Sequence, residues 1–482
     1  MHGGAEAPTQ TVRGVGRVAG VVASLHGRIG SRVRGQALVA APVLALGAGL
    51  LLAICSQEAP RPGGPASEPP SAGTAPAAGA RPGIEPENAG ADLNLYLDAA
   101  RTAWRLVERT YQPATGLMSA TPHWDYATTW DIASGIAALY SAHELDLLRD
   151  AEYDRRMRRL LATLKRAPLV DGITYNKDYA TRTGVLPTRA ERPLAHGWSA
   201  IDLGRFLVWL KIVAVNQPQY AQDVQAIVNR TDFGRVIRGG YLHGEQPSAS
   251  QKGKRWRYLE GRIGYEQYAA IGFAVWGHRA EKALDLMANA QPMTLLGVPL
   301  YRDRRKLDRL TSEPFFLMGI ELGWTPEVRE LARNVLAAQE ARYRQTGKLT
   351  MVSEDALSVP PYYFYYYCVF CNGKAWVIDA ASPGKNFDRP RWISTKAAFG
   401  WHALFPNEYT ERVLTELRKA RSDEGWHSGL YEESLVPTGV TDINTAAVIL
   451  EAALYKLQGR PLIGPTGWQA FAPGPQPAGP GE

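Results

Sequence analysis

Six apolar segments of one design constrain the fold of this chain more than any other feature. Each opens with a polar or aromatic cluster and continues as a helical pattern rich in Ala, Gly and Ser. They begin near Thr128, Gly197, Gly264, Ser312, Ser394 and Thr441. Because a helix that is apolar on nearly every side must be buried, the six segments are predicted to form inner helices.

A more polar, amphipathic stretch precedes each apolar segment. The stretches cover about 92–110, 151–166, 218–231, 279–290, 326–343 and 408–420. An amphipathic helix packs its apolar face on a buried partner and leaves its polar face in water. Six outer and six inner helices predict an all-α fold, an (α/α)6 toroid over 92–462, with a small β-like insertion near 348–378.

The connections between these helices differ in length according to their direction. Few residues lead from an inner helix to the next outer helix. The connections from outer to inner helices are long, at about 111–127, 167–196, 232–263, 291–311, 344–393 and 421–440. Loops this long in a compact domain are usually functional or disordered. All of them emerge where the inner helices begin, so we expect the binding site at that end.

The two ends of the chain lack a globular pattern. Residues 1–36 are basic, 37–55 hold an uncharged apolar run of about bilayer-spanning length, and 56–91 form a tether rich in Pro, Ala and Gly. The positive-inside rule then predicts an inner-membrane anchor with the main domain periplasmic or extracellular. A cleaved signal peptide and lipidation of Cys55 stay open as alternatives. Residues 463–482 are predicted to be a disordered tail.

The charge and the cysteines exclude several classes of function. The formal net charge of the 482 residues is +7, much of it in the basic tail, and no Lys/Arg cluster marks the toroid, so nucleic acid is not a predicted partner. Cys368 and Cys371 form a lone C-x-x-C among strand-forming neighbours, which favours a local disulfide or two buried thiols. Without an H-E-x-x-H or phosphate-binding motif, no metal and no cofactor are predicted.

Acids alternate with aromatic residues in the long loops and at the starts of the inner helices. Sugars present apolar C–H faces and polar edges, so rings and carboxylates together suggest a carbohydrate ligand, and glycoside cleavage needs two carboxyl groups. The candidate catalytic residues are Glu354, Asp131, Glu260 and Asp355. The candidate substrate-binding residues are Trp130, Trp198, Glu266, Tyr268, Glu313, Trp426 and Asp442.

Three of the helix-start acids also have a structural interpretation. Asp131 follows Thr128, and Asp202 follows Ser199, at the three-residue spacing of a helix capping box. For Asp131 the functional and capping interpretations both stay open, because Trp residues flank it. For Asp202 we favour capping. Asp442 could simply complement the dipole of the last helix.

Glu354 and Asp355 are the most informative pair. They follow a short β-like run and precede a Pro-Pro turn, and no adjacent basic residue explains them. Two consecutive carboxylates on an extended chain point in opposite directions, so one of them faces the site, and we favour Glu354. Glu260, by contrast, has Arg262 nearby as an ion-pair partner.

The series of motifs resembles a bacterial domain-of-unknown-function family, number 3131. The resemblance covers about 92–462 and rests on the motifs TTWDIAS, GWSAIDLGRFLVWLKI, EGRIGYEQYAA, TSEPFFLMGIELGW, LTMVSEDAL, STKAAFGW and TDINTAAVILEAALYK. This family is similar in outline to glycoamylase-like helical-toroid proteins that act on glucans, which implies the same fold class. His427 stands where the resemblance implies an aromatic residue.

Together these observations predict an exported, membrane-anchored glycoside hydrolase or transglycosylase. It would act on a cell-envelope or secreted polysaccharide by carboxylate general acid/base catalysis. One alternative is a non-catalytic carbohydrate-binding or polysaccharide-assembly protein that uses the same cleft. Another is a polysaccharide lyase, for which Arg255, Arg257 and Arg262 could neutralise an acidic sugar.

Overall fold

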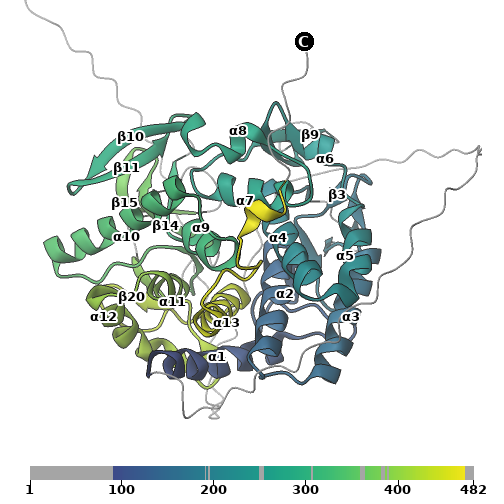
Figure 1. Ribbon diagram of the computed structural model, residues 1–482, viewed down its shortest axis with the longest axis horizontal. Helices are drawn as coiled ribbons and strands as arrows, with labels where there is room; N and C mark the ends of the chain where they lie inside the picture. The colour runs from purple at the N-terminus through teal and green to yellow at the C-terminus, as the bar shows by residue number, and fades with distance from the viewer. Residues whose placement is uncertain are drawn as a thin grey trace, which may run out of the picture. The chain divides into compact units, whose positions relative to one another are not determined.

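The computed structural model describes residues 91–472, and these residues belong to one compact unit (Figure 1). The positions left undescribed within this range are 190–191, 194–195, 249–253, 306–307, 359–363, 381–385 and 388–389. The predicted basic tail, the apolar run with Cys55 and nearly all of the tether lie outside the described residues. Within the described part of the chain, no helix is both long enough and apolar enough to cross a bilayer.

The apolar segments form a closed inner ring of helices. They are α2 (Thr129–Glu144), α4 (Ala200–Asn216), α7 (Tyr265–Ala274), α9 (Glu313–Leu317) with its π-helical continuation η4 (Met318–Leu322), α11 (Thr395–Leu404) and α13 (Ile443–Gln458). Each contacts the next, and α13 contacts α2. Nearly all of their residues are buried, as the apolar pattern requires.

The small residues of these segments allow the inner helices to approach one another closely. A Cβ atom at Gly204 of α4 would lie 2.4 Å from the Cα atom of Ala269, and one at Gly272 of α7 would lie 2.1 Å from the carbonyl oxygen of Gly204. These distances are far shorter than any normal carbon contact, so only glycine fits where α4 and α7 meet.

The amphipathic stretches form the outer helices. They are α1 (Ala91–Thr110), α3 (Asp150–Arg166), η2 (Pro218–Tyr220) with α5 (Ala221–Val228), α8 (Glu281–Leu284) with η3 (Leu286–Ala288), α10 (Pro326–Thr346), and α12 (Glu408–Leu417) with η5 (Arg418–Ala420). Each packs on an inner helix, so the fold is a helical toroid, as predicted. The stretch 279–290 forms less helix than expected, because Asp285 accepts hydrogen bonds from the following backbone and starts a new turn.

The long connections carry short antiparallel strands. The two- and three-stranded sheets are β1 (Tyr126–Thr128) with β4 (Asp178–Ala180), β2 (Leu169–Val170) with β3 (Thr174–Tyr175), β5 (Thr188–Arg189) with β6 (Arg192–Pro193), β7 (Ile237–Arg238) with β8 (Tyr241–Pro247) and β9 (Arg255–Leu259), β10 (Ala290–Leu295) with β11 (Val298–Asp303), β17 (Trp392–Ser394) with β20 (Gly429–Tyr431), and β18 (Arg421–Ser422) with β19 (Gly425–Trp426). A single helical turn, α6 (Phe233–Val236), precedes β7.

The connection after α10 carries a larger sheet. This connection supplies the strands β13 (Glu354–Ala356), β14 (Phe364–Cys371), β15 (Lys374–Ala380) and β16 (Asn386–Phe387), and β12 (Arg309–Leu310), which precedes α9, pairs with β14. In its register Glu354 pairs with Tyr366. Cys368 and Cys371 on β14 are buried free thiols, which agrees with the second of the two alternatives left open for them.

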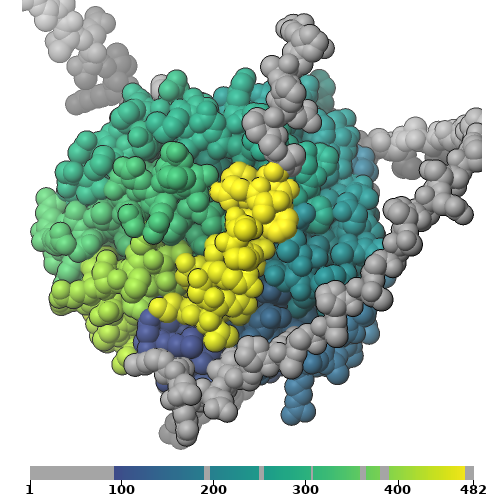
Figure 2. All heavy atoms as spheres, in the orientation of Figure 1, coloured from purple at the N-terminus to yellow at the C-terminus, as the bar shows by residue number. Residues whose placement is uncertain are grey.

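The C-terminal residues 463–472 are ordered, contrary to the predicted tail. The backbone N–H groups of Leu462 and Ile463 donate to the carbonyl oxygens of Ile320 and Glu321 at 2.9 and 2.8 Å. The short helix η6 (Trp468–Ala470) follows, and the Trp468 ring is buried. These residues cross one face of the ring (yellow in Figures 1 and 2). Because Glu321 lies at the C-terminal end of its inner helix, this face is opposite the long loops.

Candidate active site

A cavity of about 810 Å³ lies where the inner helices begin. The first turn of every inner helix contributes to its wall, through Trp130 and Asp131, Asp202, Tyr265, Glu313, Lys396 and Asn444. The long loops complete the wall with further acids and rings, among them Trp256, Tyr258, Glu260, Glu354 and Tyr366. The cavity therefore lies at the end of the toroid that the loop lengths indicated, and it combines carboxylates with aromatic rings.

Glu354 and Glu313 share one tyrosine hydroxyl in this wall. The hydroxyl oxygen of Tyr265 lies 2.9 Å from Glu313 Oε2 and 3.1 Å from Glu354 Oε2. Lys396 Nζ donates to Glu313 Oε1 at 2.7 Å. Burial, reinforced by the charge of Glu313, raises the pKa of Glu354 to about 7. Glu354 is thus partly protonated near neutral pH and can donate a proton to a ligand.

Asp202 presents a second carboxyl group from the first turn of α4. Its backbone N–H donates to Ser199 Oγ at 3.2 Å, so Ser199 caps the helix as expected. The Asp202 carboxyl does not return the bond to the Ser199 backbone, which a capping box requires. Burial raises the pKa of Asp202 to about 7, against the opposing charge of Lys177. Capping therefore describes Ser199 but not the Asp202 side chain, which lines the cavity.

Glu260 also borders the cavity, but both of its oxygens are engaged. Glu260 Oε1 accepts the N–H of Ala200 at 2.8 Å, and Oε2 accepts Arg262 Nη2 at 3.1 Å. Glu260 therefore satisfies the backbone donor of Ala200 in the first turn of α4. Predicted as a catalytic residue, Glu260 is placed to hold the turn that carries Asp202.

Asp131 forms a complete capping box at the start of α2. Asp131 Oδ2 accepts the backbone N–H of Thr128 at 2.8 Å, and Oδ1 accepts Asn444 Nδ2 at 2.8 Å. The carboxylate lines the cavity with both oxygens occupied. Its neighbour Trp130 also lines the cavity, with its ring 5.9 Å from that of Tyr265. The geometry favours a capping role for Asp131 and a ligand-facing role for Trp130.

Asp355 points away from the cavity, on the opposite side of β13 from Glu354. Its Oδ2 accepts the indole N–H of Trp392 at 2.7 Å, and its side chain is buried. Burial raises the pKa of Asp355 to about 7, with Lys396 opposing the shift. The alternation of an extended chain explains why consecutive carboxylates separate here. The side chain of Asp355, predicted to be catalytic, therefore does not reach a ligand in this cavity.

Four of the predicted substrate-binding residues are buried in the scaffold. The Trp198 indole donates to the carbonyl of His243 at 3.1 Å, and the Tyr268 hydroxyl donates to Glu321 at 2.5 Å. Glu266 forms an ion pair with Arg305 at 2.6 Å, and Asp442 Oδ1 accepts the N–H of Thr445 at 2.9 Å as the cap of α13. None of these four side chains lines the cavity among the described residues.

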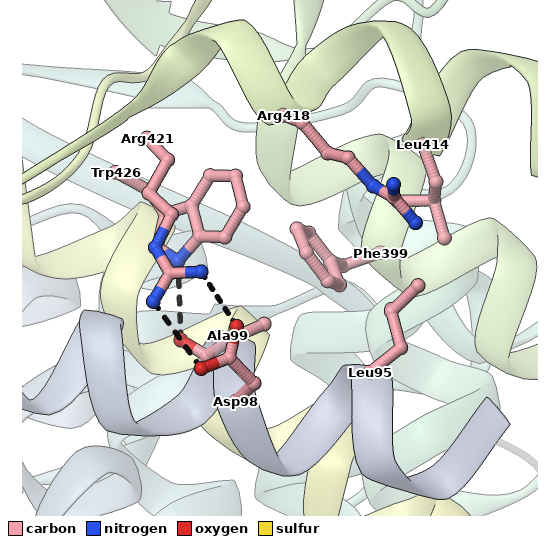
Figure 3. Close-up of a pocket in the computed structure, with 8 residues that line it drawn as sticks. All are labelled: Leu95, Asp98, Ala99, Phe399, Leu414, Arg418, Arg421 and Trp426. Carbon is pink, nitrogen blue, oxygen red and sulfur yellow. Dashed lines mark hydrogen bonds and ion pairs between the residues drawn. The ribbon is translucent and has the colours of Figure 1, made fainter. Parts of the chain in front are cut away.

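Trp426 lies in a different place, against the outer helix α1. Its indole N–H donates to the carbonyl of Ala99 at 3.1 Å, beside the Arg421–Asp98 ion pair (Figure 3). Phe399 and Trp426 line a separate pocket of about 470 Å³ there. Trp426 therefore does not line the larger cavity, and the pocket that it does line lacks that cavity's carboxylate cluster.

Several residues of the cavity escaped the sequence analysis. The S-x-x-D spacing predicts that Asp202 caps the helix. It does not show whether the Asp202 carboxylate or a distant group accepts the backbone N–H groups at the helix start. Lys396 offered a usable signal, since it is a lone cation in an otherwise apolar inner segment. Tyr265 and Asn444 offered a weaker sequence signal, because their roles depend on the neighbouring helices.

A family profile described as "Protein of unknown function (DUF3131)" matches residues 98–459. The match spans the region over which the motif series was found. No curated protein matches the chain.

Solved structures share the fold at low sequence identity. An endo-β-1,2-glucanase from Chitinophaga pinensis, in complex with sophorotriose and glucose, superposes with a TM-score of 0.58 at 12% identity over 79% of this chain and 94% of that chain. A candidate glucoamylase from Bacteroides caccae gives 0.59 at 15% identity, over 79% and 95%. An endo-β-1,2-glucanase from Talaromyces funiculosus with sophorose gives 0.53 at 10%, over 77% and 85%. Identities this low show the glucoamylase-like helical toroid alone.

Proposed function

Because the chain belongs to the DUF3131 family and folds as a glucoamylase-like helical toroid, we propose that it is a glycoside hydrolase. The proposed enzyme has six outer/inner helix pairs with a β insertion in the fifth long loop. It is exported, anchored in the membrane, and cleaves a cell-envelope or secreted polysaccharide with two carboxyl groups.

One observation carries this proposal. Two carboxyl groups that are partly protonated near neutral pH, Asp202 and Glu354, line the same cavity together with aromatic rings. Glu354 is the proposed general acid, because the charge of Glu313 beside it raises its pKa and favours its protonated form. Asp202 is the proposed base or nucleophile, because the nearby charge of Lys177 favours its ionised form. Glycoside hydrolysis requires this division of roles.

A β-linked glucan is the substrate class to test first. Two of the solved structures with this fold are endo-β-1,2-glucanases, one with sophorotriose and glucose and one with sophorose. The cavity of this chain has rings for the faces of a neutral sugar, and its cations are largely paired. Arg255, Arg257 and Arg262 bind Asp171, Glu245 and Glu260. The arginines that a lyase would need are thus already neutralised, which favours hydrolysis.

The test measures new reducing ends after incubation of purified protein with β-1,2-glucan and a panel of bacterial polysaccharides. We expect Glu354→Gln and Asp202→Asn each to lower kcat by about 10²–10⁴-fold, the usual contribution of a general acid or base. The melting temperature should stay close to that of the wild type, because neither carboxyl holds the scaffold together. Asp131→Asn serves as the control, since that carboxylate is a cap.

Two results would contradict the proposal. Full activity in both the Glu354 and the Asp202 variants would exclude these residues as the catalytic pair. Binding of a polysaccharide by the wild type without any new reducing ends would exclude hydrolysis and leave a carbohydrate-binding protein.

Export and anchoring rest on the sequence of the first 55 residues. A reporter enzyme active only outside the cytoplasm, fused after residue 60, should be active. The protein should stay in the membrane fraction and leave it when residues 37–54 are deleted. A Cys55→Ala variant separates the two anchors, because it releases a lipid-anchored protein and leaves a transmembrane one in place. An inactive reporter would contradict export.

A further inference from the structure

Two tryptophan rings are exposed on the loop end of the toroid. Among the described residues, Trp124 is 38% exposed and Trp256 is 57% exposed. Single exposed apolar side chains are common, so the position of each ring, rather than its exposure alone, indicates whether it has a role. Only Trp256 of these two lines the cavity.

Trp256 belongs to an aromatic face on strand β9. Successive side chains of a strand alternate, so Trp256, Tyr258 and the next even position, Glu260, project to one side. The ring centroids of Trp256 and Tyr258 are 5.6 Å apart, and all three residues line the cavity. From Trp256 to Glu260, four residue steps of an extended chain cover about 13 Å. The face therefore leads from the rim to the turn of α4 that carries Asp202.

The opposite side of β9 is anchored by ion pairs. Arg255 Nε lies 2.7 Å from Asp171 Oδ2, and Arg257 Nη2 lies 3.3 Å from Glu245 Oε2. Arg257 reaches the cavity wall as well, but Glu245 holds its guanidinium group. The strand is thus fixed from one side, and its aromatic side is free for a ligand.

Gly244 on β8 makes room for this aromatic face. A Cβ atom there would lie 2.4 Å from Tyr258 Cζ and 2.7 Å from Glu260 Oε1. The Tyr258 ring therefore lies over the backbone of β8, and Trp256 lies beside a ring that is already fixed. A platform that needs no rearrangement loses little entropy when a ligand binds.

We propose that Trp256 and Tyr258 form a distal sugar subsite, which binds a glycosyl unit away from the bond that is cleaved. This inference rests on the proposed glycoside hydrolase function and specifies its substrate as a long glycan chain. About 13 Å of extended chain separates Trp256 from Glu260, which holds the turn of Asp202, so intervening sugar units must bridge this distance. The enzyme therefore prefers long chains and cleaves them internally.

The test uses β-1,2-linked glucose oligosaccharides of increasing length. Binding is measured by calorimetry in the Glu354→Gln background, where turnover is blocked, and cleavage is measured with Glu354 intact. We expect Trp256→Ala to weaken the binding of long oligosaccharides about tenfold, the contribution of one aromatic contact. The shortest substrate that is cleaved should be cleaved at the wild-type rate. Trp256→Phe, which keeps a ring, should recover part of the loss.

Trp124→Ala is the matched control. Trp124 is also exposed and also lies near a Tyr two residues on, at 5.8 Å from Tyr126, but it does not line the cavity. This variant should bind and cleave as the wild type does. If the wild type binds and cleaves the oligosaccharides and Trp256→Ala changes neither property, the subsite alone is overturned. An equal loss in both Trp variants would have the same consequence. Failure of every variant, the wild type included, to bind or cleave any oligosaccharide would overturn the proposed function and the subsite with it.

Discussion

At the scale of single residues, the proposed reaction depends on the protonation of two acids in the cavity. Burial raises the pKa of Asp202 and of Glu354 to about 7, and the charges nearby then set which of the two ionises first. A base must be ionised and an acid must be protonated, so activity rises with pH through the pKa of Asp202 and falls through that of Glu354. We therefore expect a bell-shaped dependence of kcat/KM on pH centred near 7.

Lys177 tests this assignment without removing a catalytic group. Its charge lowers the pKa of Asp202, so Lys177→Met should raise that pKa and move the acidic limb of the kcat/KM profile to higher pH. The basic limb should stay in place. Lys165→Met is the control, because Lys165 pairs with Asp223 on the outer helices at 2.6 Å. A shift of the basic limb instead would reverse the roles of Asp202 and Glu354.

The sequence predicted that Glu354 faces a site with aromatic residues, and Glu354 does line the cavity, but the sequence did not indicate Asp202 beside it. The alternation of an extended chain was enough to separate Glu354 from Asp355. The S-x-x-D spacing at Ser199 was not enough to place Asp202, because it does not show that the carboxyl faces the cavity or that Glu260, 60 residues away, accepts the N–H of Ala200 at the same helix start. Which group satisfies a helix end depends on the tertiary contacts, which local spacing does not contain.

A buried ion cluster beneath Trp130 determines how stability depends on pH. The guanidinium group of Arg205 lies 4.9 Å from the Trp130 ring centroid and binds Glu321 and Glu451 at 3.0 and 2.9 Å. Two carboxylates on one arginine leave an excess negative charge in the core. Burial raises the pKa of Glu451 well above its usual value of 4.5, against the opposing charge of Arg205, and so favours the neutral form of Glu451 in the folded protein.

A carboxyl whose pKa is higher in the folded than in the unfolded state stabilises the fold at low pH. This contribution is lost as the pH rises above 4.5 toward the folded-state pKa. Glu451→Gln keeps the neutral form at every pH, so its free energy of unfolding should fall less than that of the wild type as the pH rises above 4.5. Urea titrations at several pH values measure this. An equal slope in both proteins would show that Glu451 is ionised when folded.

The companion variant Glu321→Gln should behave differently. It breaks the Arg205–Glu321 ion pair and leaves Glu451 on Arg205, and it should lower the free energy of unfolding by about 3–5 kcal/mol.

At the scale of helices, the close contact of α4 with α7 depends on glycine. Gly204→Ala would place a Cβ atom 2.4 Å from the backbone of Ala269, which side-chain motion cannot relieve. We expect a loss of about 1–3 kcal/mol or more in the free energy of unfolding, measured by urea denaturation.

Gly135→Ala on α2 is the matched control. The nearest atom to its Cβ would be the sulfur of Met118, at 2.9 Å on a flexible side chain. Alanine also has the higher helix propensity, by about 1 kcal/mol, so this variant should be close to neutral. A greater loss in Gly135→Ala than in Gly204→Ala would mean that the α4–α7 contact is not the tight one.

The helices were easier to predict than the strands. Inner segments that are apolar on every side and outer segments with one apolar face have strong periodic signals. The stretch 279–290 was predicted too long, because the cap at Asp285 interrupts it. The pairs β8–β9 and β10–β11 were predicted only as parts of long loops, because their strands are short and only partly buried and so carry little hydrophobic alternation.

At the scale of the whole domain, the two ends of the toroid have different tasks. The long loops and the first turns of the inner helices surround the cavity at one end. The unequal loop lengths alone located that end correctly. The closure of the other end was not predictable, because the proline- and glycine-rich composition of the C-terminal residues resembles that of a disordered tail.

The C-terminal segment 461–472 should therefore stabilise the fold without taking part in the reaction. Its Leu462, Ile463 and Trp468 side chains are buried, and it closes the ring above Glu321. Deletion after residue 459 should lower the free energy of unfolding by about 3 kcal/mol or more, given about 1.5–3 kcal/mol for each large apolar side chain. Deletion after residue 472 should change nothing measurable. At a temperature where the shorter protein is still folded, kcat should equal that of the full chain, because the cavity lies at the opposite end. A loss of kcat in folded protein would show that the two ends are coupled through Arg205 and Trp130, which lie between them.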